Sequence, residues 1–210
     1  MRGRDIKKYG YEFANLWLIN THNGVKEKGI KPIKIDDYPA IKKHLDGYYS
    51  LLEKRTDKGD TPYNLRNCAY IEDFSMQKIV YPNMTSFLPF YLDNKGFVQN
   101  DKSFMITGKC LSYLTCFLNS SLFKFCYIEN FPALGEKGRE LRKIFFDKIA
   151  VKLIDNKTDL MFEKLILNIQ KIKEEDKDTR LFEIEIDNLI FDIHQITIEE
   201  REIIGFIDLK

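Results

Sequence analysis

The sequence lacks the features that mark membrane and secreted proteins. It has no apolar run close to the roughly 18 residues of a membrane-spanning helix. Residues 1–5 do not lead into the apolar core of a signal peptide. The four cysteines form no Cys-x-x-Cys pair, and Cys110, Cys116 and Cys126 lie in strongly apolar sequence, where cysteine usually behaves as a small hydrophobic residue. We therefore expect a soluble protein of a reducing compartment.

Motifs for catalysis and cofactor binding are also missing. No segment matches the glycine-rich patterns that hold a nucleotide or a phosphate, and residues 135–138 contain only two glycines. The histidines His22, His44 and His194 stand far apart, without the spacing of a metal-binding pair. The only Glu-x-Lys of the kind that a metal-dependent nuclease needs, residues 175–177, lies in a charged run between predicted helices. These absences predict a chain with no catalytic activity of its own; a small enzyme that uses a cysteine or a histidine is the alternative.

One predicted loop resembles a motif found in enzymes. Asp60-Thr61-Pro62-Tyr63 resembles the Asn/Asp-Pro-Pro-Tyr motif with which amino-methyltransferases hold a flipped adenine. Here Thr61 replaces the first proline, no buried strand is expected before the motif, and no cofactor loop lies upstream. We interpret the segment as a loop rather than a methyl-transfer site.

What the sequence does contain is enough apolar residues for a core, and an uneven distribution of charge. Of the 210 residues 44% are hydrophobic, which excludes disordered and low-complexity classes. The net charge is +1, but residues 1–150 hold 24 Lys and Arg against 17 Asp and Glu, whereas residues 151–210 hold 9 against 15. A basic body joined to an acidic tail fits a nucleic-acid partner and a protein-facing segment, and ordinary surface scatter is the alternative explanation.

The hydrophobic pattern predicts a mixed α+β (α/β) fold: a small, partly antiparallel sheet with flanking helices, followed by a C-terminal helical hairpin. We expect a body at residues 1–154 and a C-terminal helical extension at residues 155–210. Strands are expected at residues 14–19, 31–35, 78–81, 86–92 and 103–107, and near residue 154. Helices are expected at residues 37–55, at 111–125 with a break at 119–121, in residues 139–154, and in the tail.

The tail repeats apolar residues at helical spacing. One apolar stripe begins at Phe162 and a second at Phe182, and the charged residues 173–178 separate them. Two antiparallel helices joined by a charged turn are the simplest arrangement. Residues 197–200 have the form of a capping box, which predicts a final short helix.

The polar loop at residues 53–67 is the main functional candidate. It contains Gly59 and Pro62 and no apolar period, and long loops in compact domains are often functional. Phosphate contacts need Lys and Arg on exposed loops, and base reading in the major groove needs Arg, Asn or Gln. A solvated linker is the alternative for the loop, and a core position is the alternative for Tyr63, whose ring could stack on a sugar or base. The candidate residues of this loop are Arg55, Lys58, Tyr63, Asn64, Arg66 and Asn67.

Several blocks in order resemble the TaqI-like C-terminal specificity domain, which is the target recognition domain of type II restriction-modification enzymes with adenine-specific methyltransferase activity. The resemblance begins with residues 2–9 and the expected strand at 16–19, and it covers nearly the whole chain. The other blocks are residues 38–45, 61–70, 78–82, 104–108, 114–119 and 186–200.

The resemblance implies an α/β domain with helical additions that reads double-stranded DNA. It also implies that methyltransferase and nuclease domains lie elsewhere in a parent enzyme, where they would use S-adenosylmethionine and Mg²⁺, and that the protein acts in the cytoplasm of a bacterium or archaeon. On this basis residues 1–154 are a DNA target recognition domain. Supporting DNA contacts are expected from Arg2, Arg4, Lys137 and Arg139.

A protein-interaction or assembly module is the alternative function. In that case the acidic helices of the tail would bind a partner, and the basic loops would be incidental.

Overall fold

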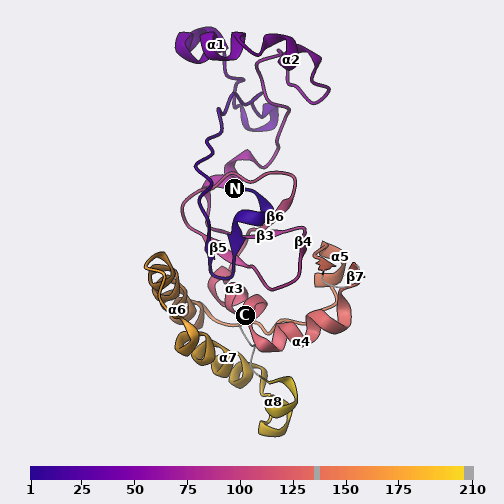
Figure 1. Ribbon diagram of the computed structural model, residues 1–210, viewed down its shortest axis with the longest axis vertical. Coiled ribbons are helices and arrows are strands. Elements are labelled where there is room, and N and C mark those ends of the chain that lie inside the picture. Colours follow the sequence, from indigo (N-terminus) through magenta and orange to yellow (C-terminus); the bar gives the residue numbers. More distant parts are fainter. Residues whose placement is uncertain (135–137, 206–210) are drawn as a thin grey trace. The chain divides into compact units, whose positions relative to one another are not determined.

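The computed structural model describes residues 1–134 and 138–205, and the chain divides into two compact units. Unit 1 consists of Met1–Leu16 and Asp73–Lys210, and unit 2 consists of Trp17–Glu72. Figure 1 shows both units, with the ribbon coloured by position in the sequence. Each unit is described separately.

Unit 1 contains three small sheets, and every strand pair in the described residues is antiparallel. The largest sheet has the order β5-β3-β6, with β3 (Lys78–Pro82) between β5 (Tyr91–Asp93) and β6 (Ser103–Ile106). Its register pairs Val80 with Tyr91 on one side and with Met105 on the other. The smaller sheets are β1 (Ile6–Lys7) with β2 (Gly10–Tyr11), and β4 (Met84–Thr85) with β8 (Gly138–Glu140) and β7 (Ala133–Leu134).

The helices of unit 1 cover this sheet in layers (Figure 1). Beside the strands are α3 (Leu111–Asn119) and α4 (Ser121–Asn130), and beyond them are α6 (Asn156–Glu174) and α7 (Arg180–His194). The shorter helices of this unit are α5 (Lys143–Phe146), α8 (Ile198–Ile204) and the 3-10 turn η1 (Gly3–Asp5). The 3-10 turn η4 (Ile71–Ser75) contains the boundary between the units.

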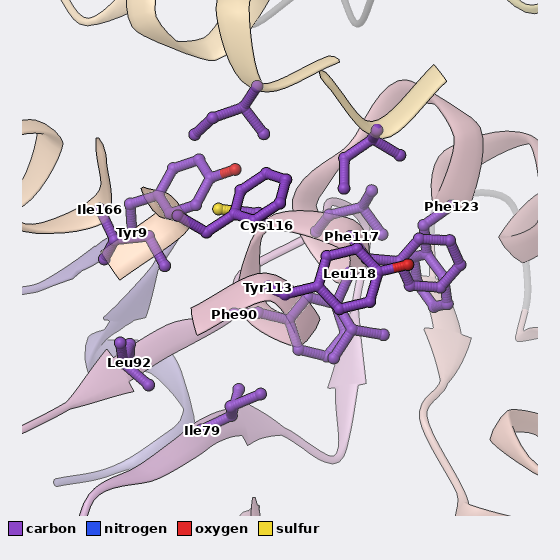
Figure 2. Close-up of a cluster of buried hydrophobic side chains, with 14 of the residues drawn as sticks. Tyr9, Ile79, Phe90, Leu92, Tyr113, Cys116, Phe117, Leu118, Phe123 and Ile166 are labelled. Atoms are coloured by element: carbon purple, nitrogen blue, oxygen red, sulfur yellow. The ribbon is translucent and has the colours of Figure 1, made fainter. Parts of the chain in front are cut away.

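The core of unit 1 lies between the sheet and the helices (Figure 2). Phe90, Phe117 and Phe123 pack with tilted or perpendicular rings, the arrangement that aromatic quadrupoles favour. Tyr9 and Cys116 are buried at one edge of the cluster, and burial raises the pKa of the Tyr9 hydroxyl and of the Cys116 thiol. Both groups are therefore neutral members of the core, and the prediction that Cys116 acts as a small hydrophobic residue is confirmed.

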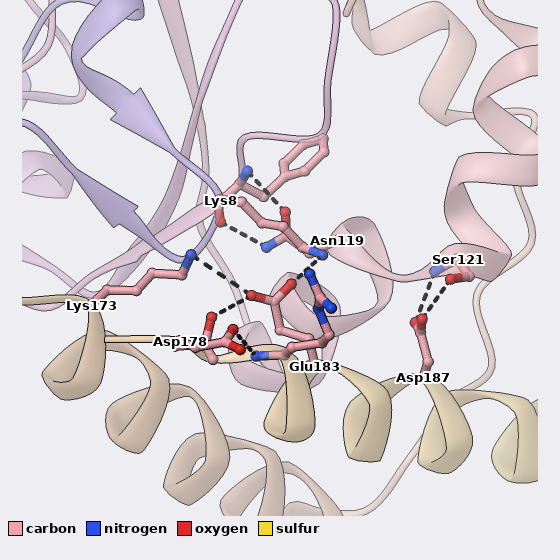
Figure 3. Close-up of polar contacts among 10 residues, drawn as sticks. Lys8, Asn119, Ser121, Lys173, Asp178, Glu183 and Asp187 are labelled. Atoms are coloured by element: carbon pink, nitrogen blue, oxygen red, sulfur yellow. Dashed lines mark hydrogen bonds and ion pairs between the residues drawn. The ribbon is translucent and has the colours of Figure 1, made fainter. Parts of the chain in front are cut away.

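Buried polar contacts fix the C-terminal hairpin to the rest of unit 1 (Figure 3). Lys8 Nζ lies 2.6 Å from Glu183 Oε2, and both side chains are largely buried. Asp187 accepts hydrogen bonds from the backbone N–H of Ser121 at 2.8 Å and from its hydroxyl at 2.5 Å. Because α7 supplies both carboxylates, this helix is attached to the N-terminal segment and to the start of α4 by groups that would be costly to leave unpaired.

A second buried ion pair lies in the sheet itself. Lys78 Nζ is 2.6 Å from Asp93 Oδ2, and both side chains are fully buried. Asp93 also accepts hydrogen bonds from the backbone N–H groups of Lys95 and Phe97, which shapes the turn after β5. A buried pair of this kind is tolerated when further hydrogen bonds satisfy the ions, as they do here.

Unit 2 is built mainly from turns and two short helices. The helices are α1 (Pro39–Asp46), with proline in its first turn, and α2 (Tyr49–Lys54), and the 3-10 turns are η2 (Lys26–Lys28) and η3 (Ile35–Asp37). Neither α1 nor α2 contains a buried residue. The buried hydrophobic side chains of this unit are Val25 and Ile35, and the other buried side chains are polar.

The fold prediction is confirmed: the chain is mixed α+β, with small antiparallel sheets and a C-terminal helical hairpin. The capping box of the last helix is also present, with Thr197 and Glu200 bonded reciprocally. The helices of residues 155–204 pack into the core of unit 1, and the segment that forms a unit of its own is residues 17–72.

Several predicted strands are wrong. Residues 14–19 and 31–35 form no strand in the described structure, and no strand ends near residue 154. In the first case no neighbouring strand pairs with the apolar run; in the second, Pro32 has no N–H and a 3-10 turn begins at Ile35. The strand expected at 86–92 is reduced to β5, because the Thr85 hydroxyl accepts the Phe87 N–H in a local turn.

Candidate nucleic-acid interface

The loop at residues 55–67 has a defined shape in unit 2. Lys58 and Leu65 form an isolated antiparallel bridge, and the Gly59 N–H donates to the Asn64 carbonyl at 2.9 Å. The Leu65 N–H donates to the Thr21 carbonyl at 2.9 Å, and the Thr21 hydroxyl donates to the Tyr63 carbonyl at 2.7 Å. These hydrogen bonds close the loop against the segment at residues 21–24, so the loop is not a solvated linker.

Asn23 is the first anchor of the loop. Its Nδ2 donates to Asp60 Oδ1 at 3.1 Å and to Asn67 Oδ1 at 2.6 Å, while its Oδ1 accepts the Asp60 N–H at 2.8 Å. Gly59 is required at this contact, because a Cβ there would lie 2.5 Å from Asn23 Oδ1. Gly24 beside it has φ +74°, which favours glycine.

Asn64 is the second anchor. Its side chain is 3% exposed, its Nδ2 donates to the Ile33 carbonyl at 2.9 Å, and its Oδ1 accepts the Thr61 hydroxyl at 2.6 Å. The Nη2 of Arg55 donates to the carbonyls of Pro62 and Asn64 within the loop. The side-chain amide of Asn64 and the Nη2 of Arg55 therefore hold the loop.

Tyr63 is attached to helix α1. Its hydroxyl donates to Asp46 Oδ1 at 2.6 Å, and this hydrogen bond raises the pKa of Tyr63 to about 12. Its ring is 5.5 Å from that of Tyr49. The ring is half-buried rather than in a core.

Three of the predicted residues present polar groups at the surface of the loop. Arg66 is exposed and has no hydrogen bond or ion pair to any residue that the structure describes. Lys58 is exposed, with Nζ donating to the Glu53 carbonyl. Asn67 is exposed, and in the described part of the chain only its Oδ1 is engaged, by Asn23. These are the residue types suited to phosphates and base edges.

A second basic loop lies beside this one, and sequence reasoning assigned it no functional role. Residues 25–35 include Lys26, Lys28, Lys31 and Lys34, all exposed, and the bond from Asn64 to the Ile33 carbonyl fastens this loop to the first. Only Lys28 forms an ion pair among the described residues, with Glu72. The signal available in the sequence was the recurrence of lysine at 28, 31 and 34, which a strand assignment obscured.

The other predicted residues belong to unit 1. Arg2 is paired with Asp5, whose pKa is lowered by the hydrogen bond from Arg2, and Arg4 is exposed. Arg139 donates to the Phe131 carbonyl and lies over the Tyr127 ring, so it has a packing role. Lys137 lies outside the described residues.

The described part of the chain shows no group of three or more His, Cys, Asp or Glu side chains arranged to hold a metal ion. It also has no helix that combines the length and hydrophobicity needed to cross a bilayer. The segment 60–63 that imitates an adenine clamp is used otherwise, since the Asp60 carboxylate accepts from Asn23 and the Pro62 carbonyl accepts from Arg55.

Comparison with known proteins adds no identification: no protein-family model matches the sequence, and no curated protein matches it either.

Proposed function

We propose that the chain is a double-stranded DNA recognition module whose contact surface is the paired loops 25–35 and 55–67 of unit 2. The observation that carries this proposal is that Asn64 fastens two loops with several Lys and Arg residues to each other, while Asn23 fastens the loop at 55–67 to the segment 21–24. Loops that are already held in a defined shape, with exposed cationic side chains, lose little conformational entropy on binding a phosphate backbone.

The sequence resemblance supports a narrower proposal: a specificity domain of a type II restriction-modification enzyme, acting in the cytoplasm of a bacterium or archaeon and directing adenine methylation and any cleavage by the parent enzyme. Methyl transfer and any cleavage would then belong to methyltransferase and nuclease domains outside these 210 residues, which would hold S-adenosylmethionine and Mg²⁺. The purified chain would bind DNA and transfer no methyl group.

The loops divide into two kinds of contact. Lys31, Lys34 and Lys58 provide point charges for phosphates, and Arg66 with Asn67 provides donors for base edges. We therefore assign backbone binding to the lysines and base reading to the end of the 55–67 loop. Asn64 and Arg55, which hold the loop, are not part of the proposed contact set.

The test uses the full chain and a duplex selected from a randomised pool, compared with a scrambled duplex at about 50 and 200 mM salt. Lys58→Ala and Lys34→Ala are expected to weaken binding to both duplexes alike and to reduce the slope of log affinity against log salt by about one unit each. Arg66→Ala is expected to cost roughly 1–3 kcal/mol on the selected duplex only, which relaxes specificity at one position.

Lys102→Ala is the matched control, because Lys102 is an exposed lysine of unit 1 outside the loops. It should leave affinity and salt slope unchanged. If the loop variants bind as the unmodified chain does, the DNA surface is elsewhere. If no duplex selected from the pool binds more tightly than a non-specific duplex, the proposed DNA-recognition function is wrong.

A protein-assembly module is the second candidate, favoured by the apolar surface of unit 2. Leu51 is 66% exposed on α2, and Tyr38 and Tyr48 are about half exposed beside α1. A unit with so little buried apolar surface is stabilised when a partner covers it. Binding with a shallow salt dependence and no response to the lysine variants would favour this function over DNA recognition.

A further inference from the structure

Helices α6 and α7 carry two rows of residues with the same spacing and opposite charge. The row on α6 is Lys157, Leu160, Lys164, Leu167 and Lys171. The row on and just before α7 is Asp178, Leu181, Glu185, Asn188 and Asp192. Both follow the pattern i, i+3, i+7, i+10, i+14, which places the members that lie within a helix along one side of it; Asp178 precedes α7.

Both rows point away from the core of unit 1. The opposite sides of the helices are buried, at Phe162 and Ile166 on α6 and at Ile186 and Ile190 on α7. Every member of both rows is exposed. Leu160 is 56%, Leu167 46% and Leu181 81% exposed. Figure 1 shows the two helices beyond α3, on the side away from the strands.

Other charged side chains of α6 do not neutralise its row. Asp159 accepts the Tyr113 N–H, Glu163 accepts from Gln77, and Glu174 pairs with Lys95. In the described structure Lys164, Lys171 and Glu185 form no ion pair. Asp192 pairs with Arg201 of α8 and keeps an exposed carboxylate.

The hairpin sets the charges of both rows at matching levels. At the far end from the turn, Tyr113 contacts both helices: its N–H donates to Asp159 of α6, and its hydroxyl lies 2.9 Å from His194 Nε2 of α7. At the turn end, Lys173 lies 3.7 Å from Glu183. The helices are therefore antiparallel. Counted from the Lys173–Glu183 contact, Lys171 lies level with Glu185 and Lys164 with Asp192.

We propose that this face binds a second copy of the chain, with the α6 row of each copy on the α7 row of the other. A two-fold axis parallel to the helices produces this arrangement, because it keeps every residue at its own level while it exchanges α6 for α7. Lys171 of each copy then faces Glu185 of the other copy, and Lys164 faces Asp192. The four helices form an antiparallel bundle, and the contact is closed, as two-fold symmetry requires.

Charge complementarity is what selects a second copy over other partners. The row on α6 alone would suit an acidic surface and the row on α7 alone a basic one, but only a molecule that carries both rows at the same spacing satisfies both at once. Exposed ion pairs contribute little each, so the apolar contacts of the leucines supply affinity, while the charges fix orientation and partner.

The test is the mass of the full chain by sedimentation at low salt, up to about 0.3 mM, the range in which a weak dimer is populated. The unmodified chain should form dimers. Lys171→Glu and Glu185→Lys each place like charges across both contacts and should raise the dimer dissociation constant at least about tenfold. A mixture of these two variants should associate again, because every contact between the two different variants is complementary. The double variant should dimerise by itself.

Lys102→Glu, an equal charge change on unit 1 outside the hairpin, should leave dimerisation unchanged. Circular dichroism of each variant should match that of the unmodified chain, since the exchanged side chains are exposed. A monomer at every concentration would overturn the proposal. Single variants that dimerise as strongly as the unmodified chain would also overturn it. So would a mixture of the two variants that fails to associate while each variant is folded.

Discussion

Single residues decide whether the candidate loop keeps its shape, and Gly59 is the clearest case. Replacing Gly59 with alanine would place a Cβ 2.5 Å from Asn23 Oδ1 and 2.6 Å from the Leu65 carbonyl. The loop must then shift, at a cost of roughly 1–3 kcal/mol. We expect faster hydrogen exchange at the Leu65 amide, which donates to Thr21, and weaker DNA binding.

Gly47→Ala is the control for Gly59. Gly47 has right-handed helical angles, and a Cβ there meets only the His44 carbonyl at 3.4 Å. Alanine is tolerated at such a position and can stabilise it by about 0.4–1 kcal/mol. Equal effects of the two substitutions would show that the Asn23 contact does not hold the loop.

Asp187 gives a pH dependence whose sign follows from its burial. Burial raises the pKa of Asp187 above its ordinary value of 3.8, against the lowering effect of the Ser121 hydrogen bonds. The folded state therefore binds this proton more tightly than the unfolded state. The resulting stability is fully present below pH 3.8 and is lost as the pH rises through the raised pKa.

Asp187→Asn should remove this pH dependence. An amide can accept the Ser121 N–H and donate to the Ser121 hydroxyl, so both contacts survive without a buried charge. Urea unfolding from about pH 3.5 to about pH 7 should show the Asn variant gaining stability relative to the unmodified chain as the pH rises. Parallel curves for the two proteins would contradict this account; the exposed Asp101→Asn should give such a parallel curve.

Among the secondary-structure elements, the sequence predicted helices well and strands poorly. Helical spacing of apolar residues is a local signal, and it located α3, α4, α6 and α7 together with the break at Ser120. A strand also needs a partner at the right distance, and the sequence does not show whether one is present. Residues 14–19 have the composition of a strand, yet no strand pairs with them in the described structure.

The C-terminal hairpin should unfold together with the sheet of unit 1. Phe162 of α6 is fully buried in the same cluster as Ile79 of β3. Phe162→Ala should therefore cost about 3–5 kcal/mol, and helix and aromatic signals should fall in one transition during urea unfolding. Ile203→Ala, at a position that is 77% exposed, should have almost no effect. Two separate transitions would instead support an independent extension beginning at residue 155.

For the whole molecule, the sequence located the candidate loop but did not predict how the loop is held together. The loop at residues 55–67 could be found because polar, Gly- and Pro-marked segments are seldom core. The sequence did not show that Asn64 would be buried or that Asn23 would join Asp60 to Asn67. Such roles depend on contacts across some forty residues, and the same residue types serve equally well at an exposed binding surface.

The difference in burial between the two units predicts a difference in local stability. The core of unit 1 is a large aromatic and aliphatic cluster, whereas the buried side chains of unit 2 are mostly polar. Local unfolding costs least where few apolar contacts are lost. Amides of unit 2 such as Leu65 and Ile30 should therefore exchange at least about ten times faster than those of Ile79 and Val80 in β3.

A DNA ligand should reduce this difference. A ligand that binds only the folded form of unit 2 stabilises that form, so a saturating duplex should slow exchange at Leu65 and leave the β3 amides unchanged. Equal exchange in the two units without DNA would contradict the burial argument. Slowing in β3 alone would place the DNA on unit 1.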